Sequence, residues 1–155
     1  MLCPCGSARP LKICCGRFHA GAEPPDAPTL MRSRFSAFAV RDWDYLWRTL
    51  DPDHVDRSDD FATWRARAEA DSHELRFRKL LVLATSGPDA QGFAHVLFHA
   101  DIRHGRAQRS FAEHSRFRHD GTGWRYLDGV VLADRDLPRP LEKLDFDAFH
   151  LAARR

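Results

Sequence analysis

The amino-acid sequence predicts an α+β protein that carries a short cysteine-rich segment in front of its main domain. All four cysteines lie within the first 15 of the 155 residues. Apolar residues then recur at helical spacing between residues 29 and 70, and alternate with polar residues from residue 73 to residue 132. Helices that precede a meander of strands, instead of alternating with single strands, indicate the α+β class.

The cysteine-rich segment, residues 1–22, has the pattern expected of a metal site. Its thiols follow a C-x-C-x8-C-C spacing, at Cys3, Cys5, Cys14 and Cys15. Four thiolates form the tetrahedral ligand set that Zn²⁺ prefers. A segment with so few apolar residues cannot fold on a core of its own, and a metal could supply the missing folding energy. Disulfides and inert thiols are the alternatives, but clustered cysteines in intracellular chains more often bind metal. The sequence therefore predicts one zinc ion bound by these four residues.

Helices are predicted for the first half of the main domain. Residues 23–28 are rich in proline and are expected to form a linker. Thr29 is the predicted N-cap of a helix that ends near residue 41. A second helix is expected over Trp43 to Leu50, and a third, lying on the surface, over Phe61 to Ala70. The apolar face of the first helix comprises Leu30, Met31, Phe35, Phe38 and Ala39.

Strands are predicted for the second half. The first follows His73 and slips in phase near Lys79, which indicates a β-bulge. The others are expected over 93–103, 109–118 and 124–132, separated by turns rich in glycine and aspartate. The main domain is thus expected to span residues 29–135, and residues 136–155, which contain two prolines, are expected to form a loosely packed tail.

Glu113 is the candidate for acid–base chemistry. Strand alternation places it on the same side as Phe111 and Phe117, where desolvation raises the pKa of a carboxyl group. The alternative is a structural ion pair with Arg32 or Arg34 of the first helix. Ser115 and Tyr45 are expected in the same hydrogen-bond network.

A second group of polar residues follows the strand over 93–103. His95, His99 and Asp101 share one face at two-residue spacing, and could form a metal site or an acid–base pair. On a face open to solvent, the same residues would have no special role.

Composition gives little support to several functional classes. The chain is 43% hydrophobic and 30% charged, which is ordinary for a globular protein, and its net charge of +2 gives no support for nucleic-acid binding. Arginine and aromatic residues are interleaved over 109–126, but acidic residues lie among them. The sequence contains no secretory signal and no apolar run of membrane-spanning length, so a cytoplasmic location is expected.

Two sets of motifs resemble known families. CPCGS…KICCG resembles the SEC-C motif, although Ala8 stands where a glycine is common. This resemblance implies that Cys14 and Cys15 both bind the metal, with His19 as a substitute if Cys15 points away. MRSRFSAFAVRDWDYLWRTLDP and FAEHSRFRHDGTGWRYLDG resemble the bacterial YchJ family. Asp51-Pro52 replaces the His-Pro of that family, and the second, C-terminal SEC-C copy is absent.

The YchJ resemblance implies a nuclear-transport-factor-2-like (NTF2-like, cystatin-like) fold, a cone of three helices against a curved antiparallel sheet. It favours an interaction or adaptor protein that docks a protein partner through the SEC-C segment, where Arg9, Lys12 and Arg17 present positive charge. Small-molecule binding or isomerase- or dehydratase-like catalysis in the cone is the alternative, since one fold hosts many functions. Nucleic-acid binding is a third and weaker hypothesis.

Overall fold

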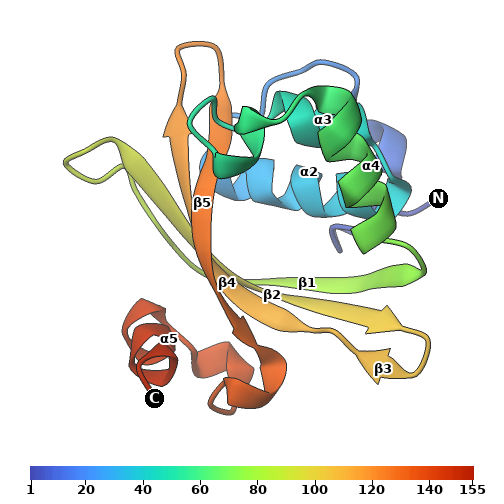
Figure 1. Cartoon of the computed structure of the whole chain (residues 1–155). Coiled ribbons are helices and arrows are strands. Elements are labelled where there is room, and N and C mark those ends of the chain that lie inside the picture. Colours follow the sequence, from blue (N-terminus) through green and yellow to red (C-terminus); the bar gives the residue numbers. More distant parts are fainter.

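The computed structural model describes residues 1–155 and confirms the α+β class. Helices α2 (Ala27–Val40), α3 (Trp43–Arg48) and α4 (Phe61–Asp71) lie together on one side of a curved antiparallel sheet (Figure 1). The sheet has the order β1-β2-β4-β5, and the short β3 pairs with β2. Its strands are β1 (Leu75–Ser86), β2 (Phe93–His104), β3 (Ala107–Gln108), β4 (Phe111–His119) and β5 (Trp124–Ala133). No helix is long and apolar enough to cross a membrane.

Aspartate side chains start the three helices of the cone. Asp26 accepts a hydrogen bond from the backbone N–H of Thr29 (2.8 Å), so the N-cap of α2 is Asp26 and the prediction of Thr29 was wrong. The physical reason is that Ala27 and Pro28 fit the first helical turn, where a missing donor costs nothing. Asp42 and Asp60 cap α3 and α4 in the same way.

The main core lies between these helices and the sheet. The predicted apolar face of β2 is confirmed, since its members all belong to the main cluster of buried residues: Ala94, Val96, Phe98, Ala100 and Ile102. The bulge predicted near Lys79 is also present, as a register shift between Phe77 and Lys79. A second shift, between Val82 and Ala84, had no signal in the sequence.

The C-terminal residues are packed, which corrects the expectation of a loose tail. They form two short 3-10 helices, η3 (Asp134–Asp136) and η4 (Leu141–Lys143), and then helix α5 (Phe146–Ala153). Helix α5 lies on the side of the sheet opposite to α2 (Figure 1). Phe149 is fully buried in a second core with Leu97 and Ala112, so this face of the sheet is not open to solvent. The prediction of a loose tail gave weight to Pro138 and Pro140, but both precede α5 and leave it free to form a short helix with a buried face.

We predict that Phe149→Ala lowers the free energy of unfolding by about 3–5 kcal/mol, because it opens a cavity in the second core. Leu151→Ala, in the same helix but at a side chain that is 55% exposed, is the matched control and should change stability little. Chemical denaturation of the two variants checks this. Equal effects would show that α5 is not docked on the sheet.

Candidate metal centre and adjoining cavity

The four cysteine sulfur atoms converge in the N-terminal segment. All four Sγ atoms lie within 4.8 Å of one another, and none forms a disulfide. Cys3 and Cys5 lie on a loop closed by a bridge between Leu2 and Pro10. Cys14 and Cys15 lie between the 3-10 helix η1 (Leu11–Ile13) and helix α1 (Gly16–His19). Four closely spaced thiols of this kind can hold a metal ion.

Backbone geometry explains two positions of the motif. A Cβ atom at Gly16 would lie 2.6 Å from the carbonyl oxygen of Leu11, so only glycine allows the two short helices to pack. Ala8 has a φ of 64°, in the left-handed region that favours glycine. The departure from the SEC-C pattern at Ala8 therefore keeps the backbone conformation at some cost in strain.

The electrostatics of the cluster suit a bound cation. Burial raises the pKa of Cys5 and of Cys15. Burial opposes ionisation of Cys3 as well, but hydrogen bonds from the Ser36 hydroxyl and from the backbone amides of Cys5 and Cys15 lower its pKa to about 6. Four neighbouring thiolates repel one another, so full ionisation requires a positive ion between them.

The cysteine segment is packed against α2. His19 lies apart from the sulfur cluster, with its Nε2 atom 2.9 Å from the carbonyl oxygen of Ser33 and its ring against Tyr45. Phe18 is buried in the main core. Cys3 Sγ lies 3.4 Å from Ser36 Oγ, in a buried hydrogen bond. The segment therefore shares its packing with the cone, through α2.

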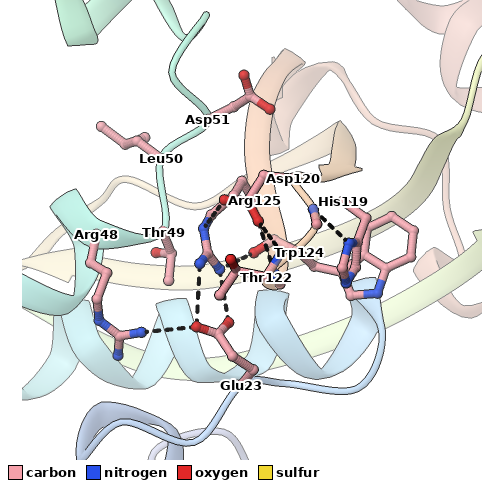
Figure 2. A network of polar contacts seen from close by, with 12 residues as sticks. Glu23, Arg48, Thr49, Leu50, Asp51, His119, Asp120, Thr122, Trp124 and Arg125 are labelled. Atoms are coloured by element: carbon pink, nitrogen blue, oxygen red, sulfur yellow. Dashed lines mark hydrogen bonds and ion pairs between the residues drawn. The ribbon is translucent and has the colours of Figure 1, made fainter.

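The segment expected to be a linker is anchored by Glu23. Figure 2 shows the carboxylate of Glu23 between Arg48, the last residue of α3, and Arg125 on β5. Arg125 donates to both of its oxygens, at 2.8 and 3.2 Å. Arg125 is itself buried and also pairs with Asp120 at 3.1 Å. Residue 23 is thus fixed to the cone, and the prolines after it turn the chain into α2.

We predict that Glu23→Ala lowers the free energy of unfolding by about 1–3 kcal/mol, because it leaves a buried guanidinium with one carboxylate fewer. Glu69→Ala is the control, since it removes the exposed Glu69–Arg65 pair on α4 and should change stability little. Thermal and chemical unfolding of both variants check this. If the two variants unfold alike, the Glu23 contacts do not hold the segment in place.

Glu113 lines a cavity between the helices and the sheet, on the side that strand alternation predicts. Its Oε2 atom accepts hydrogen bonds from Ser115, as expected, and from the hydroxyl of Tyr126 (2.8 Å), which sequence reasoning missed. Tyr45 is not part of this network; its hydroxyl lies 2.6 Å from Ser33 Oγ. Burial raises the pKa of Glu113, and the hydrogen bonds from Ser115 and Tyr126 oppose that shift only in part.

The predicted ion pair of Glu113 with an arginine is not formed. Arg32 points to the cysteine segment and donates to the carbonyl of Cys5 (3.4 Å). Arg34 enters the core, but its guanidinium packs over the ring of Tyr126, 5.0 Å from the ring centre. Tyr126 thus contacts the guanidinium with its ring and the carboxyl group of Glu113 with its hydroxyl.

The histidines of β2 do not form the group with Asp101 that their spacing allowed. His95 hydrogen-bonds to Asp89 and to His114 of β4, both at 2.8 Å, whereas His99 pairs with Asp134 (2.7 Å). His114 also contacts His150 of α5 (2.6 Å), and burial next to these two histidines lowers the pKa of His114 to about 4. These contacts depend on the pairing of β2 with β4 and on the docking of the C-terminal residues. The spacing of residues along one strand indicates neither of these.

Together, the four-cysteine segment and the cone of helices on a curved sheet define a SEC-C protein with an NTF2-like domain. The family model of the SEC-C motif matches residues 2–17, and the model described as the YchJ middle NTF2-like domain matches residues 26–129. The chain belongs to the YchJ family, and its curated relatives include proteins named UPF0225. A UPF0225 protein of Bordetella pertussis is 40% identical over 133 residues, which cover 83% of this chain and 92% of that protein. One of Streptomyces avermitilis is 40% identical over 129 residues, or 82% of each chain.

Two solved structures share the fold. The solution structure of a SEC-C motif containing protein from Rhodopseudomonas palustris is 33% identical, with a TM-score of 0.69, and the match covers 85% of this chain and 99% of that one. The crystal structure of a SEC-C motif containing protein from Psychrobacter arcticus is 24% identical, with a TM-score of 0.65 and coverage of 89% and 88%. The second likeness concerns the fold alone.

Proposed function

We propose that Cys3, Cys5, Cys14 and Cys15 bind one structural zinc ion, and that the segment so formed docks an acidic segment of another protein. Zinc is favoured because four thiolates at this spacing match its tetrahedral preference and leave no open position for catalysis. The ion supplies folding energy to a segment that buries few apolar side chains of its own. The protein is then an adaptor that presents a metal-stabilised surface on a rigid cone.

The docking proposal is carried by the outer surface of the cysteine segment. Three apolar side chains are exposed there, Met1 (82%), Leu2 (65%) and Ile13 (50%). Arg9, Lys12 and Arg17 are exposed on the same segment, and residues 1–22 contain no aspartate or glutamate. None of the three cations forms an ion pair within the chain. A surface with apolar side chains and unpaired positive charge complements a partner that offers apolar side chains flanked by carboxylates.

We predict one zinc per chain in protein purified without added metal, measured by elemental analysis. Cys3→Ser should lower the zinc content and destabilise the segment, because it removes one of the four ligands. Ser7→Ala, which removes only a hydroxyl group 3.1 Å from Cys14 Sγ, is the control and should keep the ion. Metal-free protein with four titratable thiols and an ordered segment would contradict the zinc proposal.

The docking surface is tested by charge reversal. A photo-crosslinker at Ile13 first captures the bound protein in cells, and the purified partner is then titrated against three forms of the chain. The double variant Lys12→Glu/Arg17→Glu should bind at least about tenfold more weakly, since it repels an acidic partner. Added salt should weaken binding of the unmodified chain.

The control is Arg154→Glu/Arg155→Glu, which makes the same change in net charge just after α5, on the other side of the sheet (Figure 1). It should bind as the unmodified chain does. Equal affinities for all three forms would overturn the docking proposal, and zinc content would still be measured independently.

A further inference from the structure

The cavity between the helices and the sheet has the shape of a small-molecule site. Its volume is about 310 Å³, and 10 of its 14 lining residues are hydrophobic. The apolar walls come from α2, β1, β2 and β4, and include Met31, Phe35, Phe77, Phe98, Ile102 and Phe111. Few polar groups face such a volume, so those that do decide which ligand it accepts. The polar or charged residues that line it are Arg34, Asp71, Ser72 and Glu113.

Arg34 is a buried cation without a counter-ion. Its side chain is held by Nη1, which donates to Leu46 O (2.9 Å) and to Thr49 Oγ1 (2.6 Å), and the residue is only 6% exposed. The Nε and Nη2 atoms donate to no acceptor in the protein. They are not among the fully buried unpaired atoms, and Arg34 lines the cavity, so a ligand there can reach them. Asp71 also lines the cavity, but the side chain of Arg34 donates only to Leu46 and Thr49. A buried unpaired guanidinium is costly, and an anion in the cavity would relieve that cost.

Glu113 offers a second free polar atom in the same cavity. Ser115 and Tyr126 both donate to Oε2, so Oε1 has no partner in the protein. Gly129 on β5 leaves room for this carboxyl group, because a Cβ atom at that position would overlap it. Burial raises the pKa of Glu113 and favours its protonated form, which can donate a hydrogen bond from Oε1.

We propose that this cavity binds a small amphipathic carboxylate. The carboxylate of the ligand accepts hydrogen bonds from the free guanidinium nitrogens of Arg34 and from Glu113, and its apolar body packs among the aliphatic and aromatic walls. Arginine suits this head group because its planar fork pairs with two oxygens at once. The site is independent of the zinc ion and of the docking surface.

Head-group selectivity tests the proposal most directly. Octanoate, octan-1-ol and octylamine, which share one apolar chain, are titrated into the full-length protein by calorimetry at mildly acidic pH, which favours the protonated form of Glu113. Octanoate should bind at least about tenfold more tightly than octanol, and octylamine should not bind, because only the carboxylate pairs with Arg34. Equal binding of all three, or binding of none, would overturn the proposal.

Variants locate the site. Ala100→Leu places extra carbon atoms inside the cavity and should abolish octanoate binding, whereas Ala66→Leu, the same change on the exposed side of α4, should not. Arg34→Lys keeps the charge but loses the fork, and should weaken binding by about tenfold. If Ala100→Leu fails to fold, the octanoate affinity of Arg34→Lys, compared with that of the unmodified chain, still tests whether the ligand binds in this cavity. Unchanged affinity in Arg34→Lys would overturn the assignment of the head-group site.

The role of Glu113 has its own readout. Arg34 from α2, together with Tyr126 and Asp128 from β5, are the titratable groups that face it. Protonated Glu113 donates to the ligand and ionised Glu113 repels it, so octanoate affinity should fall as pH rises through the raised pKa of Glu113. Glu113→Gln keeps a neutral donor and should bind with little dependence on pH over the same range. An equal dependence in both forms would exclude Glu113 from the site.

Discussion

Helix α2 is buried on two sides, and most of the structure depends on this constraint. One side packs on the sheet through Leu30 and Phe35, and the other faces the cysteine segment. A polar side chain in such a helix must find a partner, since an unsatisfied buried group costs stability. Ser33 therefore bonds to Leu30 O and Tyr45, and Ser36 to Cys3 Sγ. Within the MRSRFSA pattern, Arg32 and Ser36 thus contact the cysteine segment, while Met31, Phe35 and Ala37 belong to the core.

The same helix connects the metal centre to the cavity. Arg32 donates to the backbone carbonyl of Cys5, and Arg34, two residues later, borders the cavity. Arg34 keeps its position because Nη1 is held by the end of α3, at Leu46 and Thr49. The cysteine segment is held from its other end by Glu23. Sulfur cluster, linker and cavity are therefore parts of one packed unit.

Much of this organisation could be predicted from local sequence. Alternation placed every second residue of β2 from Ala94 to Ile102, and Glu113 of β4, on the side of the main core, because strand periodicity is a local property. The cysteine spacing likewise identified the sulfur cluster. The predictions that failed concerned contacts between residues far apart in the sequence. Tyr126 takes the contact to Glu113 that was expected of Arg32 or Arg34, and the proline-containing tail docks on Leu97, because both depend on how strands and helices are assembled.

Asp51 shows how one departure from the YchJ pattern is accommodated. It stands where that pattern has a histidine, its side chain is 1% exposed, and Arg118 of β4 donates to both of its oxygens, at 3.0 and 2.6 Å. Its backbone N–H donates to Tyr126 O, while Thr49 O accepts from Tyr126 N–H, so residues 49–51 pair with β5. That pairing fixes the hydroxyl of Thr49 against Arg34 and the ring of Tyr126 beneath it. The pairing of residues 49–51 with the edge strand β5, beside the Asp51–Arg118 ion pair, therefore sets the position of the cation that borders the cavity.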